Sequence, residues 1–328
     1  MAGTKPKAVP PARRGLCLAM PAGTPCPAKA VRSKPFCVEH LGPLHPSSSS
    51  SPAELARQWR EAAGRVVRGR LSGDRPGRGE YDPDLVRTLL PLALPLYRWY
   101  WRVGVRGVEN VPPAGPALLA ANHSGTLPVD GAVLKVATLT EHGRNPWLLA
   151  ADLAFRIPGL RSITRIAGNA RADRAETIAL LRGGELVGVF PEGFKGIGKG
   201  WAKRYQLQRF GRGGFVEVAM QTGAPIVPVA IVGAEEIYPM IGDIRPLARL
   251  FDLPYVPVTP FFPLLGPLGA IPLPSKWIIE YGPPIPVSGY GPEAARDRDL
   301  VLEVTEQVRG TVQRMLDANL ARRGNPFL

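Results

Sequence analysis

The residues best suited to chemistry follow two short apolar runs that are typical of buried strands. Residues 117–121 lead directly into Asn122 and His123, and residues 186–190 lead into a Pro-Glu-Gly turn that contains Glu192. Ligands of open α/β sheets bind in the crevice at the carboxyl ends of the strands. An imidazole in that place has a pKa suited to proton transfer near neutral pH. We therefore interpret His123 as a candidate general base.

A carboxylate shortly after the histidine is its candidate partner. Pro128 favours the first turn of a helix, which puts Asp130 in that turn. There it can accept the second imidazole N–H, fix the tautomer and stabilise the imidazolium. Equally open are a satisfied loop histidine, an Asp130 that only complements the helix dipole, and a Glu192 that only braces a loop. Spacing alone does not decide among these readings.

The elements that must position these residues alternate along the chain from Gly104 onward. Short apolar runs are separated by helical patterns, which predicts an α/β fold with a mixed, largely parallel sheet flanked by helices. The expected strands are 117–121, 147–150, 186–190, 226–232 and 277–281, and the expected helices are 129–138, 174–181, 213–221 and 293–323.

Three blocks follow one another in this region: Asn122-His123 with a following aspartate, VFPEG at 189–193, and APIVPVAIVG at 224–233. In order and spacing they resemble the glycerolipid (lysophospholipid) acyltransferase superfamily. The resemblance covers roughly residues 100–290 and looks closest to the monoacylglycerol-acyltransferase-like branch.

This resemblance implies an O-acyltransferase that forms no covalent enzyme intermediate. His123, oriented by Asp130, would deprotonate a hydroxyl of a glycerolipid or related lipid alcohol, which then attacks an acyl thioester of CoA or acyl-carrier protein. The Pro-Glu-Gly block would shape the acceptor pocket, and basic residues would bind an acceptor phosphate where there is one. The substrate-binding residues implied in this way are Asn122, Arg171, Phe190, Pro191, Glu192, Gly193 and Lys195.

Two departures from the family pattern bear on the acceptor. Six residues separate His123 from Asp130, whereas the family usually has four. Phe194-Lys195 stands where Thr-Arg is usual after the Pro-Glu-Gly block. Lysine lacks the bidentate fork that arginine offers a phosphate. Lysophosphatidic acid is therefore less favoured as the acceptor, and a neutral glyceride or another lipid alcohol stays open.

The first 45 residues form a separate Cys-bearing module. Its spacing is C-x8-C-x10-C-x2-H, formed by Cys17, Cys26, Cys37 and His40. Three thiolates and one imidazole complete a tetrahedral Zn²⁺ site, and the segment resembles small Cys3His zinc fingers. So short a segment needs a metal to fold, which favours structural zinc over incidental thiols in a disordered tail. No cofactor is expected for catalysis.

Charge and hydropathy suggest where the protein works. The net charge is +14, and residues 1–50 hold seven basic residues against Glu39. Such a surplus favours an anionic partner: acidic lipid, CoA-like phosphates or nucleic acid. We predict membrane-facing segments at 85–103 and 253–275; the second contains seven prolines, which excludes a lipid-exposed spanning helix. A core-packing helix pair is equally open for residues 85–103.

The predicted organisation is the finger-like module 1–45, a linker and basic helix 46–80, and an acyltransferase domain 81–328. No secretory signal is visible, so we expect a cytoplasmic protein that is peripheral on the inner face of the cell membrane. Two alternatives remain. The protein could bind nucleic acid or a partner through its N-terminal module, or be a non-catalytic lipid-binding homologue.

Overall fold

The computed structural model describes Arg57, Tyr81, Phe155 and Thr164, together with residues 83–123, 129–152, 167–250 and 255–327. The predicted zinc ligands Cys17, Cys26, Cys37 and His40 lie outside the described residues, as does nearly all of the segment 46–80. Within the described ranges, no group of three or more His, Cys, Asp or Glu side chains is placed to hold a metal.

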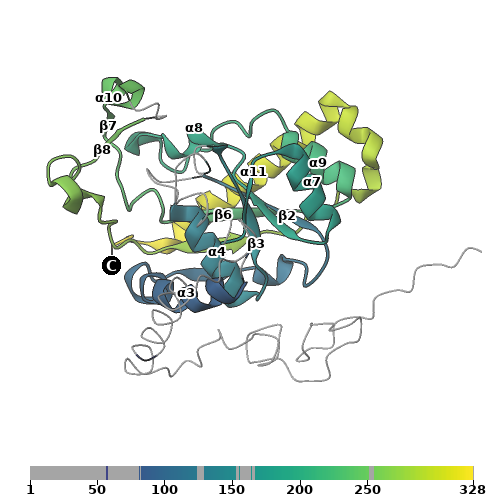
Figure 1. Ribbon diagram of the computed structural model, residues 1–328. Coiled ribbons are helices and arrows are strands. Elements are labelled where there is room, and N and C mark those ends of the chain that lie inside the picture. The colour runs from purple at the N-terminus through teal and green to yellow at the C-terminus, as the bar shows by residue number, and fades with distance from the viewer. Residues whose placement is uncertain are drawn as a thin grey trace, which may run out of the picture.

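A seven-stranded sheet runs through the centre of the protein (Figure 1). Its order is β1-β9-β6-β2-β5-β3-β4, and all neighbours are parallel except β6 and β9. This confirms the predicted mixed, largely parallel sheet. The strands are β1 Gly104–Arg106, β2 Ala117–Ala121, β3 Pro146–Ala150, β4 Asn169–Arg171, β5 Leu186–Val189, β6 Ile226–Val232 and β9 Ile278–Tyr281.

The edge strands β1 and β4 were not predicted. Each has only three residues, and neither forms an apolar run, because an edge strand has a neighbour on one side only. The central strand β2 is buried throughout. Since successive side chains alternate, Leu118 and Ala120 enter the core on one face of the sheet, and Leu119 and Ala121 enter the core on the other.

Helices cover both faces of the sheet (Figure 1). On one face lie α7 Arg174–Arg182, α9 Gly214–Thr222 and α11 Arg298–Arg323; on the other lie α3 Pro83–Pro95 and α4 Val129–Glu141. The last helix begins at Arg298 and not at residue 293 as predicted. The Asp297 side chain accepts N–H bonds from Asp299 and Leu300, which fixes the start there, and residues 292–296 form a 3-10 turn.

The segment 85–103 combines the two roles considered for it. Helix α3 continues into the π-helical turn η2 Leu96–Tyr100, where Tyr97 is buried in the core, as is Trp101 just after it. Other large side chains of the same segment are exposed: Leu89, Leu92, Leu96 and Trp99. None of the helices in the described part of the chain is both long and apolar enough to cross a bilayer.

Residues 241–273 form a projection beside the sheet, which we call the apolar lobe (Figure 1). It contains β7 Gly242–Asp243, α10 Arg245–Leu250, β8 Pro257–Val258 and the 3-10 turn η5 Gly266–Ala270. The strands β7 and β8 pair in antiparallel fashion. The Tyr100 hydroxyl donates to the Pro272 carbonyl at 2.6 Å, and the Trp101 indole donates to the Leu273 carbonyl at 3.3 Å. These bonds join the lobe to the end of residues 85–103, which we call the α3 segment.

A buried lysine holds α4 against the neighbouring strands. The Lys135 ammonium donates to the Asn145 side chain and to the carbonyls of Pro146, Ala167 and Gly168, at 2.6 to 3.1 Å. A buried cation is tolerated only where such acceptors surround it. Because α4 also carries Asp130, these contacts fix the position of the candidate catalytic carboxylate.

Candidate active site

His123 and Asp130 meet at the carboxyl end of β2. The imidazole Nδ1 lies 2.7 Å from Asp130 Oδ2; the aspartate side chain is fully buried and the histidine side chain is 13% exposed. The Gly131 N–H donates to Asp130 Oδ1 at 2.8 Å, which holds the carboxylate in place. With Asp130 as acceptor, the proton of a neutral imidazole lies on Nδ1 and Nε2 is left as a base. The two extra residues between His123 and Asp130 do not separate them.

The Glu192 carboxylate holds the backbone of His123 in place. It accepts the His123 N–H at 3.0 Å through Oε1, and the Gln208 N–H at 2.6 Å through Oε2. Lys199 Nζ lies 3.5 Å from Oε2, and the Glu192 side chain is fully buried. These contacts occupy both oxygens within the protein. The Glu192 side chain therefore braces the loop, which is one of the two roles left open for it, and the role of the Pro-Glu-Gly block in shaping the acceptor pocket stays a prediction.

Asn122 likewise has a positioning role. Its side-chain amide donates to the Ile231 carbonyl at 3.0 Å, and its oxygen accepts the Ile231 N–H at 2.7 Å. The residue is fully buried. The side chain therefore replaces one rung of backbone pairing between the end of β2 and β6. A contact of Asn122 with substrate stays a prediction.

The rest of the Pro-Glu-Gly block lies beside the imidazole. Phe190 stacks on the His123 ring with centroids 4.5 Å apart, and Gly193 is exposed with φ +57°. Pro191 is half-buried and Lys195 is exposed. The structure thus brings these residues to the site in different ways, with Phe190 in direct contact with the base.

One glycine that the sequence reading did not single out is required here. Helix α8 Phe194–Ile197 approaches His123 so closely that a Cβ on Gly196 would lie 2.6 Å from the His123 carbonyl oxygen and 2.8 Å from its Cβ. No side chain fits at that distance. The signal available in the sequence was the glycine-rich run that follows the Pro-Glu-Gly block.

Arg171 stands at the end of β4, which is three positions from β2 in the sheet order. Its side chain is 48% exposed, forms an ion pair with Asp152 at 3.3 Å, and lies 5.8 Å from the Phe155 ring centroid. It contacts neither His123 nor Lys195 among the interactions of the described residues. Arg171 therefore borders the sheet end without joining the histidine cluster.

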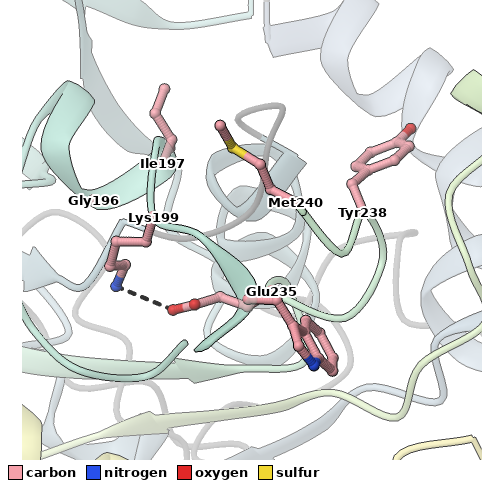
Figure 2. Close-up of a pocket in the computed structure, with 7 residues that line it drawn as sticks. Gly196, Ile197, Lys199, Glu235, Tyr238 and Met240 are labelled. Carbon is pink, nitrogen blue, oxygen red and sulfur yellow. Dashed lines mark ion pairs between the residues drawn. The ribbon is translucent and has the colours of Figure 1, made fainter. Parts of the chain in front are cut away.

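A buried ion pair lies behind α8 (Figure 2). The Lys199 ammonium and the Glu235 carboxylate point toward one another at 3.1 Å, and each side chain is at most 6% exposed. They border a pocket whose other lining residues are Gly196, Ile197, Trp201, Tyr238 and Met240. The pocket has room for about one water molecule. It is part of the support of the site and not a substrate chamber.

The buried charges continue to the C-terminal helix. Glu235 accepts the Tyr205 N–H at 3.0 Å, and the Tyr205 hydroxyl bonds to Glu236. Glu236 in turn pairs with Arg323 of α11 at 2.5 Å. Each charged side chain of this cluster therefore has a partner of opposite charge: Lys199 with Glu235, and Arg323 with Glu236.

One tyrosine of the apolar lobe is linked electrostatically to the catalytic pair. Burial, and after it the negative charge of Asp130, raises the pKa of Tyr255, the first described residue after α10.

Comparison with known proteins now adds to this geometry. A sequence model described as Acyltransferase matches residues 102–232, a range that includes the His-Asp pair and the Glu192 turn. An uncharacterized protein of Mycobacterium tuberculosis is 48% identical over 285 residues, which cover 86% of this chain and 79% of that protein. The chain belongs to the acyltransferase family.

More distant relatives carry functional names. The human "DGAT1/2-independent enzyme synthesizing storage lipids" is 26% identical over 221 residues, which cover 67% of this chain and 63% of that enzyme. The crystal structure of the 1-acyl-sn-glycerophosphate (LPA) acyltransferase PlsC from Thermotoga maritima matches with a TM-score of 0.49 and 19% identity, over 72% of this chain and 80% of that one. The family match and the human relative support an acyltransferase of lipid metabolism.

The buried Glu235 gives this acyltransferase a pH-dependent stability. Burial raises the pKa of Glu235 to about 7, from 4.5. Because the folded-state pKa exceeds the unfolded one, the stabilising contribution is full below pH 4.5 and is lost as the pH rises through 7. We expect the free energy of unfolding of the wild type, relative to Glu235→Gln, to fall across that window in urea titrations. Exposed Glu293→Gln serves as the control, and a difference that stays constant with pH would contradict this origin.

Proposed function

We propose that this acyltransferase moves an acyl chain from a thioester to the hydroxyl of a lipid alcohol, with His123 as the general base. The observation that carries the proposal is the 2.7 Å contact between His123 Nδ1 and the fully buried Asp130. It leaves Nε2 as a base in a side chain that is partly exposed. The acyl-transferring family supplies the reaction class for which such a base is needed.

The proposed step is a direct transfer. Nε2 takes the proton of the acceptor hydroxyl, and Asp130 stabilises the imidazolium that forms. The oxygen attacks the thioester carbonyl carbon, the tetrahedral intermediate collapses, and the C–S bond breaks. The thiolate leaves and takes up the proton from the imidazolium. One ester and one free thiol result, and the histidine returns to its neutral form.

The acceptor we propose is a glycerolipid or a related lipid alcohol. Lys195 is exposed beside the site, and Arg171 pairs with Asp152. The described site therefore offers one exposed lysine near His123 and no bidentate arginine pointing there. This favours an acceptor whose recognition does not depend on a tightly held phosphate, such as a neutral glyceride, over lysophosphatidic acid.

Replacement of the base tests the mechanism. We expect His123→Ala to lower kcat about 100- to 10,000-fold, which is the usual contribution of a positioned general base. Asp130→Asn should also lower kcat, since an amide does not fix the tautomer or stabilise the imidazolium. The measurement is release of free thiol from a panel of acyl thioesters and acceptors.

Asp173→Asn is the matched control, because Asp173 caps α7 away from the site. Wild-type rates in His123→Ala would reject the mechanism. A wild type that binds lipid and transfers nothing would support the non-catalytic alternative.

We further propose that the protein is peripheral on an anionic membrane surface, docked through the α3 segment and the apolar lobe. Of the large hydrophobic side chains that are exposed in the described residues, all but Tyr290 and Phe327 belong to these two segments. Those of the lobe are Ile241, Leu247, Phe261, Leu264, Leu265, Leu268 and Ile271. Docking through these side chains would hold the acyltransferase domain at the lipid surface.

Removal of exposed leucines tests the docking. We expect Leu264→Ser/Leu268→Ser to reduce binding to vesicles of phosphatidylcholine with phosphatidylglycerol about tenfold or more in co-flotation, because both side chains are largely exposed and each is worth more than 1 kcal/mol when buried in lipid. Tyr290→Ser is the control, as an exposed apolar residue outside the two segments. Equal flotation of both variants would contradict the proposal.

For the N-terminal module we propose structural zinc bound by Cys17, Cys26, Cys37 and His40. The support is the ligand set and its spacing alone. We expect the full-length protein to contain about one zinc per chain in elemental analysis, as a single four-ligand site would hold. Cys26→Ser should lower the zinc content, and unchanged content in that variant would argue against the site.

A further inference from the structure

The segment after the Pro-Glu-Gly turn has an unusual charge composition. Residues 193–216 contain six basic residues and no acidic one. Those residues are Lys195, Lys199, Lys203, Arg204, Arg209 and Arg212. Charge runs of this kind are commonly solvated faces, so the structure must show what each cation does.

The structure divides this set. Lys199 is buried between Glu192 and Glu235 and serves the fold. Lys195 belongs to α8, next to His123. The other four are exposed, and none forms an ion pair with a carboxylate of the described residues. We call them the cationic strip: Lys203, Arg204, Arg209 and Arg212.

Some arginines elsewhere on the surface have a carboxylate partner: Arg296 pairs with Glu293, Arg309 with Glu306, and Arg174 with Glu217. Others, such as Arg106, Arg182 and Arg249, are exposed without an ion pair among the described residues, but they lie singly along the chain. The cationic strip keeps four such charges together, which raises the local potential for an anion.

The backbone that carries the strip is fixed to the catalytic histidine. Glu192 accepts the His123 N–H through one oxygen and the Gln208 N–H through the other. Arg209 is the next residue in the chain. A Cβ on Gly211 would lie 3.6 Å from the Pro191 carbonyl, so the turn before Arg212 packs on the same block. A ligand that spans from the strip to His123 would therefore meet a rigid frame.

Two features give the strip its local geometry. The Arg204 guanidinium lies over the Trp201 ring, 4.4 Å from its centroid, and donates to the Trp201 carbonyl at 3.3 Å. Tyr205 just beyond it is buried, with its N–H bonded to Glu235. Arg204 is therefore held in place by stacking, which reduces the entropy lost when it binds an anion.

From these observations we propose that the cationic strip binds the phosphate groups of a CoA thioester, the acyl donor of the reaction. This rests on the proposed function, because it places the donor thioester at His123. A nucleotide with a pyrophosphate and a further phosphate matches several unneutralised cations spread along ten residues. A lipid surface fits the strip less well, since no large hydrophobic side chain is exposed among residues 195–216.

Paired charge removals test the proposal. We expect Arg209→Ala/Arg212→Ala and Lys203→Ala/Arg204→Ala each to raise the dissociation constant for CoA by roughly tenfold or more in calorimetry, since charge-assisted bonds to phosphate are lost. The wild type should bind dephospho-CoA more weakly and pantetheine most weakly, and the variants should not weaken pantetheine binding further. Arg296→Ala/Arg309→Ala is the matched control, because it removes one exposed and one partly exposed cation that already have carboxylate partners.

Three results would overturn the proposal. The first is a dissociation constant for CoA that is the same in the strip variants and the control. The second is intact CoA binding with loss of flotation on vesicles that contain phosphatidylglycerol, which would assign the strip to a lipid headgroup. The third is a wild type that ignores CoA and uses only acyl-carrier protein.

The histidine variant separates this proposal from the proposed function. His123→Ala should bind CoA as tightly as the wild type, because the strip does not include the imidazole. If His123→Ala keeps full transfer activity, the general-base mechanism is wrong. The donor site is then tested only by CoA binding to the strip variants. If His123→Ala loses transfer activity but the strip variants bind CoA as tightly as the wild type, only the proposed donor site is wrong.

Discussion

The buried carboxylate of Glu192 is the interaction on which the site depends. A charge removed from water must be matched by donors, and Glu192 finds them in the His123 N–H, the Gln208 N–H and Lys199. Satisfying this one group therefore fixes three separate stretches of chain against each other. The catalytic imidazole, the ion pair behind α8 and the segment with the exposed cations are held together for the same electrostatic reason.

The sheet and the C-terminal helix extend that constraint through the fold. The strands β2 and β5 are parallel neighbours, so their carboxyl ends lie side by side and bring His123 to Glu192. Behind them, hydrogen bonds of Tyr205 and the Glu236–Arg323 ion pair connect Glu235 to α11. The site is therefore rigid on its inner side. The apolar lobe is different in kind, because it presents large hydrophobic groups to solvent.

Two surfaces suit the two substrates that an acyltransferase of lipids must handle. Exposed hydrophobic groups on the α3 segment and the apolar lobe suit a lipid acceptor, whereas the cationic strip has no such groups and suits a water-soluble, phosphorylated donor. His123 follows the carboxyl end of β2 and is the proposed meeting point of the two substrates. Such a division would let the acceptor arrive from a membrane and the donor from water, so that only the hydroxyl and the thioester need to meet at His123.

The sequence by itself determined the class of fold and the strand ends, because apolar runs, helical periodicity and turn residues are local signals. The family followed from the resemblance of three ordered motif blocks. The sequence did not determine the partners of buried groups. Asn122 and Glu192 looked like substrate ligands, and only packing showed that their polar atoms are used within the protein. The His123–Asp130 contact and the split between buried Lys199 and its exposed neighbours were likewise decided by tertiary structure. Which charge is buried and what it pairs with depends on segments that are far apart in the chain and close only after folding.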